Sequence, residues 1–196
     1  SIAMAFPLAL ILVLLRQSDF FFLSRMARFV IGYCIGVPLL VHLFFATLVL
    51  PLFFAPAWMP SKMIRVVGML TLFGASYMAE VIRGGLQAIP KAQHEAADSL
   101  GLSRGQKMVT VILPQAIQSV FPGLVNLVVA LFKDSVLIST IAMLDILAMM
   151  QSTVANVKWM PYFVEGYVFV GLLFWAKCEG LSRVARRMEK KMEIKR

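Results

Sequence analysis

Residue types that perform chemistry are few in this sequence, and their spacing argues against an enzyme. The two histidines, His42 and His94, are far apart, the first inside an apolar run and the second in a polar segment. They form no HExxH pair, and the sequence contains no GxSxG motif or Gly-rich phosphate loop. Cys34 and Cys178 lack CxxC spacing, so neither a metal site nor a cofactor is predicted. We therefore expect a protein that catalyses no reaction itself.

The most informative polar stretch is AQHEAADSLGLSRGQKMVTVILP, which starts at Ala92 and separates two apolar blocks. Glu95 begins a helical pattern, and Gly101 interrupts it where a left-handed residue would end a helix. Ser103 precedes Gln106 by three residues, which is the spacing of a capping box at the start of a second helix. The stretch therefore predicts two short helices joined by a tight turn, the second running into the next apolar block.

We call residues 90–112 the corner, and two uses of such a corner can be compared. A DNA-binding helix-turn-helix has a similar short turn containing Gly. Apolar blocks flank the corner so closely that no helical core can form around it, which excludes that use and predicts no nucleic-acid partner. The alternative is a docking element, in which Ala96 and Ala97 let a partner approach while Glu95 and Asp98 offer hydrogen-bond acceptors.

The composition is that of a membrane protein. Hydrophobic residues make up 60% and charged residues 15% of the chain, with a mean hydropathy of +0.84. Soluble domains carry about 45–50% apolar and about 25% charged residues. We predict an all-α, polytopic membrane fold in a single domain. Its apolar runs predict five crossings and a basic tail, at about residues 2–15, 29–54, 64–83, 113–132 and 163–181, then 182–196.

Three apolar runs depart from a simple crossing. Residues 2–15 fall short of the roughly 20 residues that a span needs, so they are either an interfacial helix or a crossing whose beginning is missing before Ser1. Gly36 and Pro38 predict a kink or a close helix contact within the second run. Residues 136–150 are expected to form a short or re-entrant helix rather than a span.

The distribution of Lys and Arg predicts an orientation. With alternating crossings, the link before Phe29, the corner and the tail lie on one side and carry fifteen of these residues, against four on the other side. Lys and Arg collect on the cytoplasmic side of membrane proteins. The corner and the C-terminus are therefore predicted to be cytoplasmic and the N-terminus outside, with membrane lipid around the spans and at the basic tail.

Polar groups at membrane depth are costly and are often functional. Asp145 is the deepest charge, whereas Glu80 and Arg83, three residues apart at the end of a run, could form an ion pair. Asn126 lies in the middle of a run, where it serves either helix packing or a transport pathway. The candidates for a pathway are the polar residues within or beside the spans: Ser76, Asn126, Ser135, Ser139 and Thr140.

The corner also carries a family resemblance. The Glu95-Ala96-Ala97 run, followed by Gly101 and the sequence VILP, resembles the EAA signature of ABC importer permeases, with Val111 where that family usually has Ile. The flanking sequences AEVIRGGLQAIP and QAIQSVFPGLVNLVVALFKDSVLIS are similar to the polar amino-acid uptake subfamily, with permeases of general L-amino-acid transporters as the nearest match. Relatives usually carry Glu and Arg where this chain has Gly32 and Ile35.

This resemblance implies a mechanism and its partners. The fold would be the five-helix core of a type I ABC importer in the bacterial cytoplasmic (inner) membrane, paired with a second permease subunit, either a paralogue or a second copy. The corner would be the coupling helix, seated in a dimer of ATP-binding subunits, while a periplasmic or extracellular binding protein delivers an amino acid. The implied coupling residues are Glu95, Ala96, Ala97, Asp98, Gly101, Leu102 and Ser103.

A second hypothesis needs no transport. The chain could be a membrane scaffold or sensory partner that holds a cytoplasmic protein through residues 92–114. Purification together with an ATPase and a second permease would favour the importer, and a stable protein without an ATPase would favour the scaffold.

Overall fold

The computed structural model describes residues 1–193 and, apart from residues 56 and 188–193, their side chains. These residues form nine α-helices and no strand, which confirms the predicted all-α fold class. The helices are α1 (Ile2–Arg16), α2 (Phe21–Gly36), α3 (Leu39–Phe44), α4 (Lys62–Gln87), α5 (Lys91–Ser99), α6 (Arg104–Gln106), α7 (Leu113–Asp134), α8 (Ile146–Val154) and α9 (Phe163–Glu193). Short π-helical or 3-10 segments occupy Phe45–Val49, Leu50–Phe53, Pro56–Trp58, Lys107–Ile112, Ser135–Ile141 and Met160–Tyr162.

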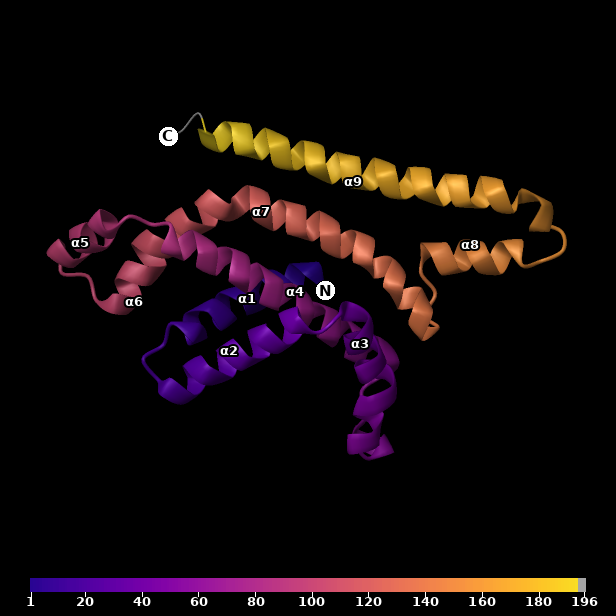
Figure 1. The fold of residues 1–196 in the computed structure, drawn as a ribbon, viewed down its shortest axis with the longest axis horizontal. Coiled ribbons are helices and arrows are strands. Elements are labelled where there is room, and N and C mark those ends of the chain that lie inside the picture. The colour runs from indigo at the N-terminus through magenta and orange to yellow at the C-terminus, as the bar shows by residue number, and fades with distance from the viewer. Residues whose placement is uncertain (194–196) are drawn as a thin grey trace.

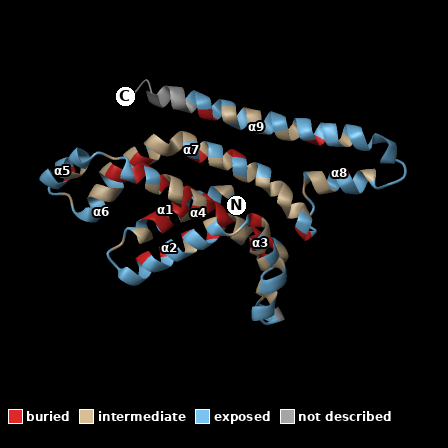
Figure 2. Ribbon diagram, in the orientation of Figure 1, coloured by how far each residue is buried: buried red, intermediate tan, exposed pale blue. Residues whose placement is uncertain are grey.

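The core lies where α1, α4 and α7 pack together, and it is the largest buried region in Figure 2. Small side chains let the helices approach closely: Ala5 and Ala9 of α1 and Ala75 and Ala79 of α4 are almost completely buried. Gly85 marks the tightest contact, because a Cβ atom there would lie 2.7 Å from the carbonyl oxygen of Ala116 on α7. The two helices that enter and leave the corner are therefore locked together beside it.

The elements at the two ends of the molecule differ (Figure 1). The connection between α1 and α2, the corner with α5 and α6, and the C-terminal end of α9 all lie at the left-hand end. The connection between α8 and α9 lies at the right-hand end. α9 runs beside α7 and α8 at the edge of the molecule and is mostly exposed (Figures 1 and 2). The predicted basic tail is a continuation of α9 as far as Glu193, and residues 194–196 lie outside the described residues.

The apolar run at 29–54 is not one straight helix. α2 begins earlier, at Phe21, so that much of the expected link before Phe29 is helical. Pro38 then separates α2 from α3, and the two helical arms meet at a bend of 108°. The predicted kink is confirmed, and it follows from the extended backbone that proline imposes on Val37 before it.

The region expected as one short helix at 136–150 is also divided. The 3-10 segment Ser135–Ile141 continues directly from α7, and Ala142 then adopts a left-handed conformation with φ of 54°. Asp145 caps α8, because its Oδ1 accepts a hydrogen bond of 2.7 Å from the backbone N–H of Ala148. Lys62, at the start of α4, donates to the Ile141 carbonyl at 2.5 Å and so anchors this break.

Five crossings were expected, but fewer helices qualify on their own length and apolarity. In residues 1–193, α4 and the continuous helical run Arg104–Ile141 are long and apolar enough to span a membrane, and the bent pair of α2 and the arm starting at Leu39 would make a third. α1 has 15 residues and is shorter than a span. The first part of α9 carries Glu165, Lys177 and Glu179, and α9 is not among the described helices that qualify as spans.

Candidate functional site

The corner starts with α5, and this helix ends just before Gly101, as the sequence predicted. The backbone N–H of Gly101 donates to the Asp98 carbonyl at 2.9 Å, and that of Leu102 donates to the Ala97 carbonyl at 3.3 Å. Gly101 has φ of +71°, a left-handed conformation that side chains disfavour. The predicted helix stop at Gly101 is therefore confirmed, and it turns the chain sharply between the two helices.

The second helix of the corner begins at the predicted capping box. The N–H of Gln106 donates to Ser103 Oγ at 3.4 Å, and the N–H of Ser103 donates to Gln106 Oε1 at 3.0 Å. From Arg104 onward α6, the π-helical segment Lys107–Ile112 and α7 form one uninterrupted helical run. A displacement of the corner would therefore be passed directly to α7.

Polar contacts brace the corner internally. Lys107 Nζ and Asp98 Oδ1 lie 2.6 Å apart across the turn, and Gln115 Nε2 donates to Gln93 Oε1 at 3.1 Å. Ala97 lies on the buried face of α5. Because these contacts join α5 to the helix that follows, the two arms are held at a fixed angle to each other.

The structure brings all seven predicted coupling residues into this one corner. Ala97 faces inward and Leu102 is half-buried, whereas the others are exposed: Glu95, Ala96, Asp98, Gly101 and Ser103. Leu100 belongs with them, although the sequence patterns did not single it out. Its side chain is 78% exposed at the tip of the turn, and the only sequence signal was an apolar residue in a polar stretch. The corner thus offers an apolar tip with carboxylates beside it.

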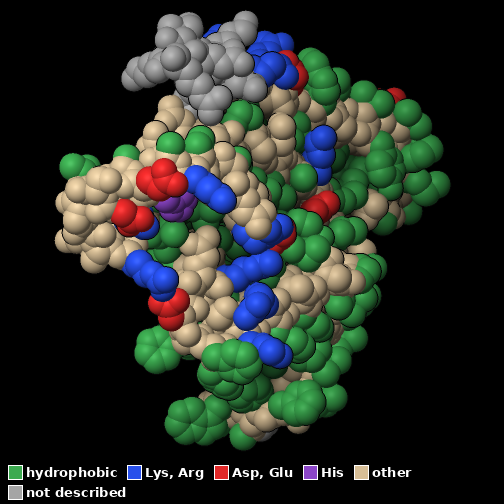
Figure 3. Space-filling view, turned by 60° about the vertical axis from the view of Figure 1, so that its left-hand side comes forward, with side chains coloured by type: hydrophobic (Ala, Val, Ile, Leu, Met, Phe, Trp, Pro, Cys, Tyr) green, Lys and Arg blue, Asp and Glu red, His purple; other side chains and the backbone are tan. Residues whose placement is uncertain are grey.

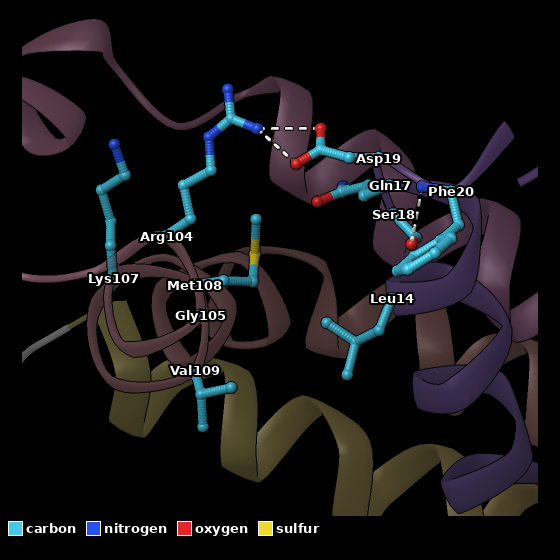
Figure 4. Close-up of a pocket in the computed structure, with 10 residues that line it drawn as sticks. All are labelled: Leu14, Gln17, Ser18, Asp19, Phe20, Arg104, Gly105, Lys107, Met108 and Val109. Carbon is cyan, nitrogen blue, oxygen red and sulfur yellow. Dashed lines mark hydrogen bonds and ion pairs between the residues drawn. The ribbon is translucent and has the colours of Figure 1, made fainter.

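A cleft of 730 Å³ lies between the corner and the connection of α1 with α2 (Figure 4). Leu14 and Phe20 contribute from one side and Met108 and Val109 from the other. Arg104 Nη1 bridges its rim by donating to both carboxylate oxygens of Asp19, at 2.8 and 2.6 Å (Figure 4). Both side chains are more than 80% exposed, so the pair adds little stability.

Glu80 joins α4 to the end of α1. It pairs with Arg83 on its own helix, as the sequence predicted, and also accepts from Arg16 Nη1 at 2.8 Å. Arg16 is the last residue of α1, so this second pair ties the end of α1 to α4. No sequence pattern indicated this second pair, because the partners are 64 residues apart.

The five candidate pathway residues are not gathered into one site. Ser76 on α4 is completely buried, and its hydroxyl donates to the Leu72 carbonyl of its own helix at 2.9 Å. Asn126 is exposed on α7. Further along the same run, three hydroxyl groups each donate to the carbonyl three residues earlier, at 2.6 to 2.7 Å. The donors are Ser135, Ser139 and Thr140.

Asp145 is an additional polar residue near the end of that run. Its Oδ2 is buried and has no hydrogen-bond partner in the described part of the chain. Gly32 and Ile35, which stand where relatives usually have Glu and Arg, lie on α2. Gly32 is exposed, and Ile35 packs against the core while its carbonyl accepts from the Tyr77 hydroxyl at 3.5 Å.

Comparisons with known proteins identify the family of the chain. The family model described as "Binding-protein-dependent transport system inner membrane component" matches residues 2–193. The inner membrane amino-acid ABC transporter permease protein YhdY of Escherichia coli is 40% identical over 195 residues, which are 100% of this chain and 53% of that protein. The glutamate/glutamine/aspartate/asparagine transport system permease protein BztC of Rhodobacter capsulatus is 38% identical over 194 residues, 98% of this chain and 45% of that protein.

A solved structure extends the likeness to three dimensions. The chain resembles a chain in the crystal structure of an amino acid ABC transporter with histidines, with a TM-score of 0.84 and 26% sequence identity, covering 97% of this chain and 86% of that chain. By contrast, this chain spans only about half the length of YhdY and BztC.

Together, the helical fold and these comparisons define a multi-pass inner membrane protein. The chain belongs to the family of binding-protein-dependent transport system inner membrane components. The resemblance to ABC importer permeases of the amino-acid uptake group is thereby confirmed.

Proposed function

We propose that this chain is the membrane-spanning permease subunit of an ATP-driven amino-acid importer, forming half of its translocation pathway. The observation that carries the proposal is the corner, a braced turn in which the seven predicted coupling residues stand together at one end of the helical core. The similarity to the amino-acid permeases YhdY and BztC, and to the solved amino acid ABC transporter, supports amino acids as the transported class.

The corner is the proposed contact with a partner that hydrolyses ATP. Leu100 would insert into an apolar depression of an ATP-binding subunit, while Glu95 and Asp98 face polar groups around it. Closure of an ATP-binding dimer would then move the corner, and the helical run starting at Arg104 would carry that motion into the membrane. The chain itself would hydrolyse nothing.

The proposed assembly also includes a second permease subunit and a binding protein outside the membrane. Asn126 is exposed on α7, so it is free to face a second permease or the pathway between the two subunits. Ser135, Ser139 and Thr140 follow it toward the opposite end from the corner and remain candidates for the pathway. Ser76 is the weakest of the five candidates because it is enclosed by its own subunit.

We propose an orientation with the corner and the C-terminus in the cytoplasm and the N-terminus outside. The support is that the α1–α2 connection, the corner and the C-terminal end of α9 lie at one end (Figure 1). These are the segments that hold most of the Lys and Arg residues.

The direct test is to purify the full-length protein with its natural partners and to reconstitute the complex in liposomes. ATP hydrolysis and uptake would be measured for a panel of amino acids, with and without the binding protein. We expect ATP-dependent uptake of one group of amino acids, stimulated by the binding protein. Purification as a stable protein that recruits a cytoplasmic partner but transports none of the panel would instead favour the scaffold.

A further inference from the structure

Four arginines lie on three neighbouring helices near the α1–α2 connection. We call them the arginine row: Arg16, Arg25, Arg28 and Arg83. Arg83 on α4 and Arg16 on α1 meet at Glu80. The Arg16 carbonyl accepts from Ser24 Oγ at 2.8 Å, which joins the end of α1 to α2. Figure 3 shows Lys and Arg side chains lined up on this side of the molecule beside hydrophobic ones.

The second half of the row lies on α2. Arg28 Nε donates to the Ser24 carbonyl at 3.2 Å, one turn from the contact with α1. Arg25 lies three residues before Arg28 and shares its face of the helix, with its guanidinium 4.6 Å from the ring centre of Phe21. These contacts link the three helices that carry the row, from α4 through α1 to α2.

The charges of the row are not balanced within the chain. Glu80 is the one carboxylate that forms ion pairs with it among the described residues, and it serves both Arg16 and Arg83. Within that same part of the chain, Arg25 and Arg28 form no ion pair, and both are exposed. Three positive charges are thus left to attract an anion from outside the chain.

The surroundings of the row indicate which anion. Phe20, Phe21 and Phe22 are 74, 70 and 71% exposed beside Arg25, and Phe29 next to Arg28 is 74% exposed. Water disfavours so many uncovered phenyl rings, whereas the boundary between headgroups and acyl chains accommodates them. A guanidinium fork binds phosphate oxygens in pairs, more specifically than a point charge does.

We propose that the arginine row binds the phosphate headgroup of an anionic phospholipid of the cytoplasmic leaflet, with the lipid chains against the phenylalanines of α2. This inference rests on the orientation in the proposed function, which places the row at the cytoplasmic surface. The bound lipid holds the α1–α2 connection at the membrane surface while the neighbouring corner is free to move.

The test measures lipid binding to the purified full-length permease in detergent, by native mass spectrometry with phosphatidylglycerol or phosphatidylcholine added. The wild type is expected to bind phosphatidylglycerol more tightly. Removing two charges with R25Q/R28Q should weaken phosphatidylglycerol binding about 25-fold, roughly fivefold per arginine, and leave phosphatidylcholine binding unchanged. R25K/R28K keeps the charges but loses the paired contacts of the fork, so it should weaken phosphatidylglycerol binding by less than R25Q/R28Q does. Soluble glycerol phosphate should not displace the lipid.

The matched control is K133Q/K158Q, which removes two exposed charges from segments distant from the corner and should leave the preference intact. An equal loss in this control, or unchanged binding by R25Q/R28Q, overturns the proposal. Unchanged lipid binding with loss of the co-purifying ATPase would assign the row to a protein contact instead. If R25Q/R28Q aggregates in gel filtration, R28Q alone decides, with a loss of about fivefold expected. Since neither ATP nor an amino acid is present, a failure of import leaves this result unaffected.

Discussion

The corner and the set of candidate pathway residues were both identified in the sequence, but only the corner residues lie together in the structure. The corner residues are neighbours in sequence, and they form one braced turn in which each arm is held to the other. The pathway candidates are spread over α4, α7 and the 3-10 segment after it, and the four that carry hydroxyls donate to carbonyls of their own helical run. The corner is complete within one chain, whereas the pathway that we propose is shared with a second subunit and would be at most half present in this chain.

This difference teaches that the shape of the corner can be tested on this chain alone, whereas the proposed pathway can be tested only in the assembled complex. Its shape depends on Gly101, Ser103 and the contact between α4 and α7. Changes at these positions should act through local backbone geometry. Changes at Asn126 should act only when the partner subunit is present.

The largest effect is expected at Gly85, where α4 and α7 pack against each other beside the corner. Gly85→Ala places a Cβ 2.7 Å from the Ala116 carbonyl oxygen, so α4 and α7 must separate. We expect the free energy of unfolding to fall by about 1–3 kcal/mol. Thermal unfolding of the purified protein in detergent would measure this.

The adjacent Gly84 supplies the control, because a Cβ there meets no atom within 4 Å. Gly84→Ala should leave stability unchanged or raise it by up to about 1 kcal/mol, through better helix propensity. Equal destabilisation by both variants would show that the close contact between α4 and α7 does not support the corner.

A smaller and more local effect is expected at the capping box. Ser103→Ala removes the acceptor for the N–H of Gln106 and should cost the start of α6 about 1 kcal/mol. Hydrogen–deuterium exchange at the first amides of α6 should become roughly fivefold faster. Ser99→Ala is the matched change, since this exposed hydroxyl only donates back to the Glu95 carbonyl; exchange that rises equally in both variants would contradict the role of the cap.

The smallest effect is expected at Ser76. Ser76→Ala removes one hydroxyl whose bond goes to its own helix, so stability should change by about 1 kcal/mol or less and uptake should stay near the wild-type rate. Asn126→Ala should lower uptake by the complete transporter more than Ser76→Ala does, while leaving the melting temperature of the isolated chain unchanged. The reverse order in uptake assays would move the pathway toward the core of this subunit.

Sequence patterns predicted the parts of the fold that are set by near neighbours. The Gly101 turn, the Ser103 capping box, the Glu80–Arg83 pair and the bend at Pro38 each depend on residues within a few positions, and all are confirmed.

Contacts between distant segments were not predictable in the same way. The Arg104–Asp19 and Arg16–Glu80 pairs depend on how α1 packs against the rest, which hydropathy does not encode. Apolar runs also overstated continuity, because Ala142 divides the stretch 136–150, which was expected to form one short helix. Leu100 was missed because a single exposed leucine has no periodic pattern.

The central claim is that the turn at Gly101 transmits work between ATP hydrolysis and transport, and one substitution tests it most directly. Gly101→Val puts a β-branched side chain at φ of +71° with no neighbour within 4 Å, so the strain of about 1–2 kcal/mol is confined to the turn. In the reconstituted complex, we expect ATP hydrolysis to continue while amino-acid uptake falls more than about tenfold, equivalent to the loss of about 1.4 kcal/mol of coupling. Gly101→Asn, which tolerates the left-handed conformation, should retain uptake. Wild-type uptake by Gly101→Val, with the protein folded in the membrane, would contradict the account.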